Sequence, residues 1–542
     1  MKKHSYIYGA IILTLGSVLA KGLGALYKIP LTNILGSYGI GMYYLIFPIF
    51  SFVITFSSSG IATGLNILVA KENGGTYRNK FKLLIVAMLL TMLVSAGLMM
   101  IIILFSKWIS LFQGYVSNSL SFVAIAPAIL ISSEIAVLRG FFQGVDNMMP
   151  TTISLLIEQV IKMVVGLTLS RALMVYGIDY AVLGAVIGVT ISEIVALVII
   201  TIHFIIYKNK YKRLYTKQKV FNKTIKNKTR VKISSLKPKI YTYISYTYKD
   251  TFFKILKLGV PLTLSKIISP IMLLIDSFII INVLVMVGFS VSGATTLYGI
   301  STGMVATIGS ITTIVVSSLI TALIPKINDD KNSNIIFIFK IIIIISLTMS
   351  VFIIIGIDAI INILFGVSSS NVYELGVASK LLKISSVSII YGAITQLCSV
   401  ILQSKNKAMV PFITLGVGVI FRIGVLVGAV VMGFNIYAVE IANAIYYSMS
   451  SIILLLSVKK YVNISLSGHS IISVGSLYFI ALIMGYVINN VLNMFIGNII
   501  ATIITSLVIG IFVIISLKFS DIFTKEEKNM LSIKRKFNKN LV

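Results

Sequence analysis

Long apolar runs recur along almost the whole chain, and they constrain its fold more than any other feature of the sequence. A helix needs roughly 20 apolar residues to cross a bilayer, and about fourteen segments reach that length. They lie near residues 6–27, 38–65, 83–105, 119–142, 151–174, 181–206, 257–287, 294–323, 335–357, 377–403, 410–432, 437–458, 471–492 and 499–518. The sequence therefore predicts an all-α polytopic membrane protein.

The composition agrees with this class and argues against several others. Of the 542 residues, 57% are hydrophobic and only 11% are charged, whereas soluble proteins have roughly 25% charged residues. Cys398 is the only cysteine and the three histidines are scattered, so neither a disulfide framework nor a metal site is expected. We also expect no cofactor and no enzymatic activity.

The distribution of basic residues predicts the orientation of the chain. The net charge of +30 does not indicate nucleic-acid binding, because lysine and arginine avoid most of the apolar spans and collect in alternate loops, as in cytoplasmic loops. These loops are residues 71–82, 325–331, 404–407, 459–460 and the segment after 518. We therefore predict a multi-pass protein of the cell membrane with both termini cytoplasmic, in which residues 1–22 form a retained first helix rather than a signal peptide.

A strongly basic linker divides the apolar spans into two sets of six. The predicted organisation is an N-terminal lobe at 1–206, the linker at 207–256, a C-terminal lobe at 257–458, two extra helices at 459–518 and a basic tail at 519–542. The linker is expected to lie on anionic headgroups. A docking arm for a partner enzyme, such as one of cell-wall synthesis, is the alternative.

Sequence similarity between the two halves indicates an internal repeat. QGVDNMMP (143–150) corresponds to QSKNKAMVP (403–411), and each is followed by a span that contains a cation, Lys162 or Arg422. VYGIDYAV (175–182) and VMGFNIYAV (431–439) correspond one hairpin later. Six spans per half give both halves the same polarity, which predicts the parallel repeat of a transporter with its site between the halves.

Three segments, at 24–74, 138–162 and 297–327, resemble the polysaccharide-transport branch of the MOP exporter superfamily, in particular the stage V sporulation protein B and MurJ-type lipid II flippases. The resemblance implies fourteen helices in two lobes around a cavity that opens to each side in turn. It also implies that the last two helices form a groove for a polyprenyl tail. The implied cargo is an undecaprenyl-pyrophosphate-linked sugar, such as lipid II, for peptidoglycan synthesis, cell shape or sporulation.

Charged residues inside the spans are the candidate functional residues, because a charge at the membrane centre costs about 2.5–3.5 kcal/mol and usually marks a pathway. Counted from the turn at 143–150, Glu134, Glu158 and Lys162 lie about 11–17 Å deep, whereas Arg139 lies about 5 Å deep and can reach the headgroups. We expect Glu134, Glu158 and Lys162 to form either a fixed polar clasp between helices or a proton-coupling site.

A second set of cations is expected to line the cavity and bind the diphosphate of the cargo. These residues are Lys21, Lys28, Lys266 and Arg422, with Asp276 and Glu440 as candidate counter-ions. Lys28 lies near the end of its span, so an interfacial anchor is an alternative role for it. Glu193 and Arg171 are expected to form pairs within a lobe or to lie at an interface, and Pro261 and Pro270 to bend the seventh span.

Lipid-linked sugar transport has three competitors. A multidrug cation antiporter of the same superfamily would need a cavity dominated by carboxylates, whereas this chain has more intramembrane lysine and arginine. A membrane glycosyltransferase would need a sizeable outer loop, and a scaffold for wall or spore assembly would not need paired intramembrane charges. The chain has no G-x-x-x-x-G-K-[ST] motif, so transport would be driven by an ion gradient, the membrane potential or removal of the cargo.

Overall fold

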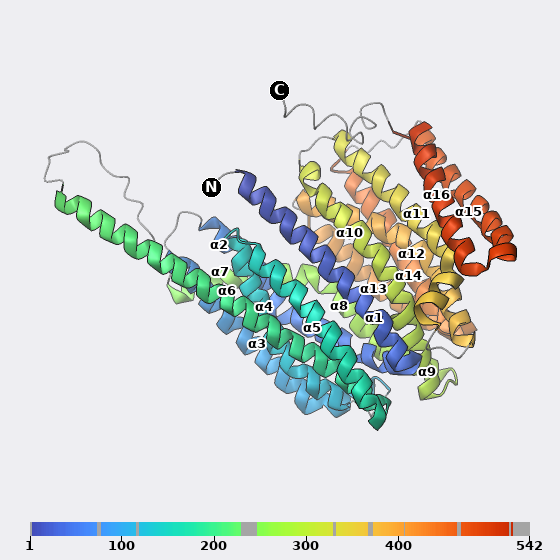
Figure 1. Ribbon diagram of the computed structural model, residues 1–542, viewed down its shortest axis with the longest axis horizontal. Coiled ribbons are helices and arrows are strands. Elements are labelled where there is room, and N and C mark those ends of the chain that lie inside the picture. Colours follow the sequence, from blue (N-terminus) through green and yellow to red (C-terminus); the bar gives the residue numbers. More distant parts are fainter. Residues whose placement is uncertain are drawn as a thin grey trace.

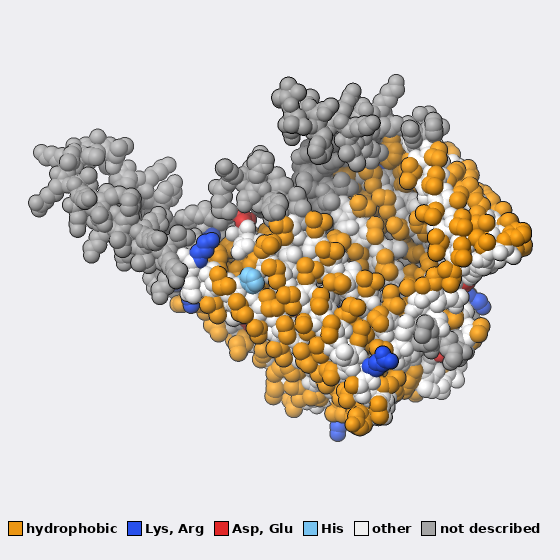
Figure 2. Space-filling view, viewed as in Figure 1, with side chains coloured by type: hydrophobic (Ala, Val, Ile, Leu, Met, Phe, Trp, Pro, Cys, Tyr) orange, Lys and Arg blue, Asp and Glu red, His pale blue; other side chains and the backbone are white. Residues whose placement is uncertain are grey.

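The computed structural model describes residues 3–72, 77–114, 119–228, 247–328, 332–366, 372–405, 407–462, 468–519 and 522–523. In these residues the chain is helical and has no strand, as the sequence predicts. Hydrophobic side chains cover most of the visible surface of the described part (Figure 2), and many large ones are exposed. A helical bundle with such a surface is suited to a lipid environment.

The helices follow the predicted spans closely. They are α1 (Lys3–Ile54), η1 (Thr55–Ser59), α2 (Gly60–Lys71), α3 (Tyr77–Phe112), α4 (Ser119–Gly144), α5 (Met149–Leu173), η2 (Met174–Tyr176), α6 (Ile178–Lys228), α7 (Tyr248–Lys266), α8 (Ile268–Met286), α9 (Val291–Gly299), η3 (Ile300–Val305), α10 (Ala306–Asn328), α11 (Asn332–Phe365), α12 (Val372–Ser404), α13 (Met409–Ala429), η4 (Val430–Phe434), α14 (Tyr437–Lys459), α15 (Gly468–Ile496) and α16 (Asn498–Phe519). Thirteen segments of the described residues are long and apolar enough to cross a membrane.

The first of these segments contains two crossings. It runs from Ile12 to Lys71 and is interrupted at Gly36, whose backbone angles are φ 65° and ψ 178°. Such angles are almost restricted to glycine, because a Cβ would clash with the backbone. After this residue the chain turns back, and α2 lies at the same upper edge of the molecule as the start of α1 (Figure 1). The described residues therefore contain fourteen crossings, the number predicted.

Both described ends of the helical bundle lie on one face. The start of α1 and the end of α16 are at the upper edge of Figure 1, which we call the terminal face. The arrangement is compatible with both ends on one side of a membrane, and their cytoplasmic location stays a prediction. Of the linker predicted at 207–256, residues 229–246 lie outside the described residues; α6 continues as a helix to Lys228, and α7 already begins at Tyr248.

Helices α1–α6 pack together as an N-terminal unit, and α8–α14 pack as a C-terminal unit. The seventh span is shared between them. It is broken at Ile267, three residues before Pro270, into α7 and α8. Helix α7 packs against α2 and α3 of the N-terminal unit, whereas α8 packs against α9 and α13 as well as against α1. Helices α15 and α16 lie at one side, against α11 (Figure 1).

Three described crossings contain a π-helical turn that hydropathy does not reveal. These turns are η1 in the second crossing, η3 in the eighth and η4 at the end of the eleventh. Such turns widen a helix locally and are frequent at functional sites. The second and eighth crossings occupy corresponding places in the predicted repeat, and η1 and η3 lie where the two units meet, because α1 packs on η3 and α7 packs on η1.

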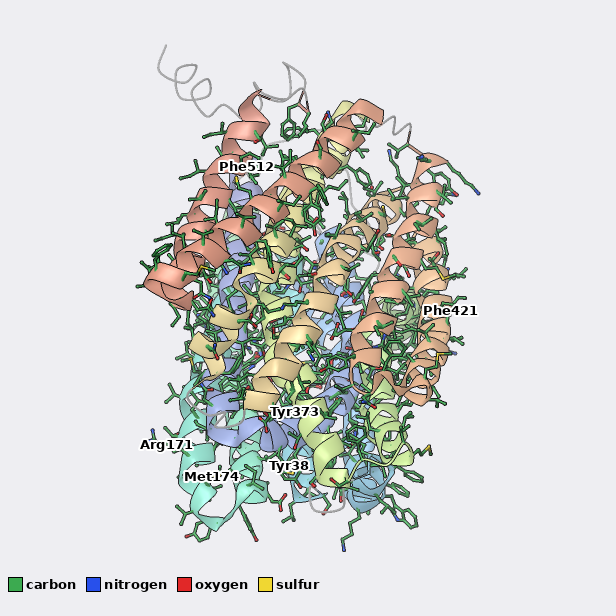
Figure 3. All side chains as sticks on the ribbon, turned by 90° about the vertical axis from the view of Figure 1, so that its right-hand side faces the viewer. Tyr38, Arg171, Met174, Tyr373, Phe421 and Phe512 are labelled. Carbon is green, nitrogen blue, oxygen red and sulfur yellow. The ribbon has the colours of Figure 1, made fainter. Side chains whose placement is uncertain are left out.

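The two units are closed against each other at the face opposite the terminal face, which we call the closed face. Ser37 donates a hydrogen bond to Glu374 at 2.5 Å, and Asn33 donates one to the carbonyl of Leu364 at 2.9 Å. Tyr38 and Tyr373, the sequence neighbours of the first pair, lie near the lower end of the molecule in Figure 3.

Glycines allow the backbones to approach closely at the closed face. A Cβ on Gly41 would meet the backbone carbonyl of Thr295, and a Cβ on Gly299 would meet that of Ser37. Side-chain amides of Gln113 and Asn282 connect α3 and α8 at the same face, donating to Ser277 and to the carbonyl of Phe112.

Candidate functional site

Two of the predicted cavity lysines lie on one face of α1. Lys21 and Lys28 are seven residues apart, which is about two helical turns. Lys21 is exposed, and Lys28 is half-buried with its Nζ 5.4 Å from the centre of the Tyr44 ring. The backbone carbonyl of Tyr44 accepts a hydrogen bond from Tyr298 of α9 at 3.2 Å. Lys28 is thus held by an aromatic side chain at the boundary between the two units.

Lys162 of α5 comes close to the same face of α1. Its Nζ lies 5.8 Å from the centre of the Tyr27 ring, and it interacts electrostatically with Lys28. A Cβ on Gly24, between the two α1 lysines, would be 3.0 Å from the side-chain oxygen of Gln159, one turn before Lys162. The structure therefore places Lys162 beside the predicted cavity cations, which the sequence pattern did not indicate.

Lys162 also belongs to a group of buried charges inside the N-terminal unit. Arg139 Nη2 lies 2.8 Å from Glu158 Oε2, and Arg139 Nε donates to Ser154 at 2.9 Å. Glu193 of α6 interacts electrostatically with Arg139, Glu158 and Lys162. We call Arg139, Glu158, Lys162 and Glu193 the N-lobe cluster; it contains two cations and two carboxylates.

Two expectations about this cluster were wrong. Arg139 does not extend to the headgroups but pairs with Glu158, with only 16% of its side chain exposed. Glu134 lies in α4 and accepts a hydrogen bond from Thr91 of α3 at 3.0 Å. The acid that approaches Glu158 and Lys162 from another helix is Glu193, because depth in the membrane does not determine the direction in which a side chain points.

Lys266 links the seventh span to the second. It is exposed at the end of α7, and its Nζ donates to Thr63 Oγ1 of α2 at 2.6 Å and to the carbonyl of Ser59 at 3.5 Å. The cation therefore lies where the seventh span breaks, between the π-helical turn η1 and α8. Arg171, in contrast, is exposed and lies near the lower edge of the molecule (Figure 3), away from these groups.

Arg422 forms the centre of a second buried cluster. Its Nη1 and Nη2 donate to the two carboxylate oxygens of Asp276 at 2.6 and 3.0 Å, and its Nε donates to Asn443 Oδ1 at 2.7 Å. The amide nitrogen of Asn443 donates to Glu440 at 3.3 Å. We call Asp276, Arg422, Glu440 and Asn443 the C-lobe cluster; it connects α8, α13 and α14.

The C-lobe cluster gives the predicted residues a specific arrangement. Asp276 is the counter-ion of Arg422, as expected, but Glu440 reaches the arginine only through Asn443. All three kinds of guanidinium nitrogen are engaged, and only 1% of the arginine is exposed. In this conformation Arg422 is a structural cation rather than a free cargo ligand. Among the described residues, no group of three or more His, Cys, Asp or Glu side chains is suited to a metal.

Comparisons with known proteins agree with this architecture. Residues 7–248 match a family described as "Polysaccharide biosynthesis protein". The stage V sporulation protein B of Bacillus subtilis (strain 168) is 22% identical over 331 residues, which are 61% of this chain and 59% of that protein. The chain thus spans less than two thirds of this curated relative.

Two solved structures share the fold. A lipid II flippase MurJ in an inward closed conformation superimposes with a TM-score of 0.68 and 16% identity, covering 96% of this chain and all of that one. An inward-facing multidrug resistance transporter of the MATE family has a TM-score of 0.60 and 16% identity, covering 84% of this chain and 98% of that one. The chain therefore has the fold of the MOP transporter superfamily, and its N-terminal part matches the polysaccharide biosynthesis family.

Proposed function

We propose that this protein is a flippase that moves an undecaprenyl-pyrophosphate-linked sugar across the cell membrane by alternating access. Lipid II or a related precursor of cell-wall polysaccharide is the proposed cargo. The observation that carries the proposal is the set of lysines at the boundary between the two units: Lys21 and Lys28 on α1, with Lys162 of α5 beside them. The likeness to a lipid II flippase along nearly the whole chain supports it.

The chemistry of these lysines suits a diphosphate. A diphosphate that leaves water needs strong donors and positive potential, which lysine provides as a point charge. Lys28 and Lys162 are near enough to repel each other, and an anion between them would relieve that repulsion. Lys266 adds a fourth lysine, on α7. Arg422 is proposed to contribute positive potential rather than direct contacts, because Asp276 and Asn443 already occupy its nitrogens.

The polyprenyl tail of such a cargo needs an apolar surface, and the two extra helices provide one. An apolar pocket lies between α11, α15 and α16, lined by side chains that include Val351, Leu477 and Val513. The outer surfaces of α15 and α16 are also rich in exposed hydrophobic side chains. We propose that the tail remains in this apolar region while the sugar diphosphate passes between the two units.

Reconstitution of the purified full-length chain into liposomes that contain fluorescent lipid II would test the proposal. We expect the chain to expose the cargo to a reagent that cannot cross the membrane, and Lys21→Glu and Lys266→Glu to abolish this activity at normal insertion levels. Lys21→Arg and Lys266→Arg should retain activity, and Lys459→Glu, on an exposed lysine at the end of α14, should behave like the parent. Parent-like binding and flipping by both cavity glutamate variants would refute the cationic site.

A cation antiporter remains the second candidate, because the C-lobe cluster contains two buried carboxylates and the fold is shared with a multidrug transporter. The two functions differ in cargo charge. Export of organic cations by the same liposomes, without flipping of lipid-linked sugars, would favour the antiporter.

The orientation of the chain is proposed from its basic loops, with both ends in the cytoplasm. Cysteines introduced at Asp179, in the first turn of α6, and at Gly433, in η4, should react with a membrane-impermeant reagent added outside the cell. A cysteine at Asn227, near the end of α6, should react only after the membrane is opened. External labelling at Asn227 would reverse the proposed topology.

A further inference from the structure

The C-lobe cluster contains one more carboxylate than it has cations. Asp276 and Glu440 are the carboxylates, and Arg422 is, within the described part of the chain, the cation that hydrogen-bonds to the cluster's polar atoms. All three residues are buried, with 8%, 7% and 1% of their surfaces exposed. A buried charge without a partner is costly, so a group that has the choice becomes neutral instead.

The geometry shows which carboxylate is the extra one. Asp276 receives two hydrogen bonds from the guanidinium, an arrangement that strongly favours its ionised form. Glu440 receives one hydrogen bond, a longer one of 3.3 Å, from the uncharged amide of Asn443. The guanidinium has Asp276 and Asn443 on its donor edges, so Glu440 has no direct cationic partner among the described residues.

We propose that Glu440 binds one proton, and that this proton is the coupling ion of the transport proposed above, on which this inference rests. A proton from water at one side of the membrane binds to a carboxylate oxygen of Glu440 and leaves to water at the other side. Arg422 is then the resident cation of the cluster and stays ionised throughout. No covalent bond to the cargo and no redox step is involved.

The proton on Glu440 controls the contact between α8 and α13. When Glu440 is neutral, Asn443 Oδ1 and both oxygens of Asp276 share the guanidinium. When Glu440 loses its proton, the new negative charge attracts Arg422 toward α14 and weakens its pair with Asp276. Helix α8 continues from α7, which packs on α2 of the N-terminal unit. The state of Glu440 is therefore connected to the position of one unit relative to the other.

The surroundings favour a proton over a metal cation. The charged and titratable groups that interact with Glu440 in the described residues are Arg422 of α13, Asp276 of α8 and Tyr447 of α14. Helix α12 also packs on α14 and contributes the hydroxyl of Thr395, which donates to the carbonyl of Tyr447. The guanidinium already occupies the position between the oxygens of Asp276 and Asn443 that a bare cation would need.

Infrared difference spectroscopy tests proton binding without any cargo. The full-length protein in lipid should show the carbonyl band of protonated carboxylic acids near neutral pH. Glu440→Gln should remove one component of this band, while the component of Glu134, a buried carboxyl whose hydrogen-bond donor is the Thr91 hydroxyl, remains. Glu193→Gln serves as the matched control, since it removes a buried carboxyl from the N-lobe cluster. The proposal is overturned if the band is absent from the parent protein or unchanged in Glu440→Gln.

Transport measurements test the coupling separately. In liposomes that hold a pH-sensitive dye, fluorescent lipid II should drive proton movement through the parent protein, and Glu440→Gln should reduce this movement at least tenfold. Glu440→Asp should restore part of it. If sodium rather than protons changes the rate of the parent, or if Glu440→Gln keeps parent-like proton movement, the assignment is wrong. Failure of lipid II flipping with an intact infrared band would reject the proposed cargo and leave the proton site standing.

Discussion

The buried charges of the two lobes differ in balance. In the N-lobe cluster, two cations accompany two carboxylates, and Lys28 adds a further cation at its edge. In the C-lobe cluster, one arginine accompanies two carboxylates. The two halves of the chain thus provide surplus positive charge on one side of the boundary and surplus negative charge on the other. The first is suited to an anionic cargo and the second to a proton.

The largest effect is expected from removing the only cation of the C-lobe cluster. Arg422→Met leaves Asp276 and Glu440 buried without a charged partner, and breaking such a pair costs about 3–5 kcal/mol. Thermal unfolding of the purified protein in detergent should show this loss. The double variant Arg422→Met/Asp276→Leu should recover much of the stability, because it restores the charge balance. Equal unfolding temperatures for Arg422→Met and the parent would show that the pair has no structural role.

A smaller effect is expected from a cation at the edge of the N-lobe cluster. Removing one charge-assisted contact to a diphosphate costs about 1.5–3 kcal/mol, or roughly ten- to a hundredfold in affinity. The affinity of Lys28→Gln for lipid II should therefore be lower than that of the parent by this factor, while the affinity of Lys28→Arg should be close to that of the parent. Equilibrium binding in detergent measures the difference. An unchanged affinity for Lys28→Gln would make this lysine an interfacial anchor held by Tyr44.

The smallest of the three effects is expected from a substitution within the N-lobe cluster, in which positive and negative charges are equal in number. Glu158→Gln removes the ion-pair partner of Arg139, which should lower stability by about 1–3 kcal/mol. Because Glu193 and Lys162 remain nearby, the pH dependence of transport should stay like that of the parent. The measurement pairs thermal unfolding with flipping rates at several pH values. A flattened pH profile would instead assign the proposed coupling proton to the N-lobe cluster.

Hydropathy predicted the crossings well because the bilayer itself determines how long an apolar helix must be. Proline chemistry predicted a bend in the seventh span, and the structure has a break at Ile267, three residues before Pro270. The π-helical turns η1 and η3 were not predicted, since an extra residue in a turn leaves the average hydrophobicity unchanged.

The charged residues were identified more reliably than their partners. Counting residues from a turn gives the depth of a side chain, but the angle around the helix axis also depends on packing. Glu134 and Glu158 therefore have separate partners, Thr91 and Arg139. Tyr27 and Tyr44 were missed because aromatic residues are common in any membrane span, and only the structure shows lysines over their rings.

In the proposed transport cycle, the closed face sets how long the closed state lasts. Its contacts come from several helices, including the hydrogen bonds of Asn33, Ser37 and Asn282 and the close approach of Gly41 to Thr295. Each hydrogen bond contributes only about 0.5–1.5 kcal/mol, but separating rigid units breaks them together. The stability of the closed state, and with it the dwell time, therefore depends on many weak contacts rather than on one strong contact. A substitution at a single position should therefore shorten the dwell time of the closed state only slightly. The rate of the cycle would change, but the sequence of its conformations would not.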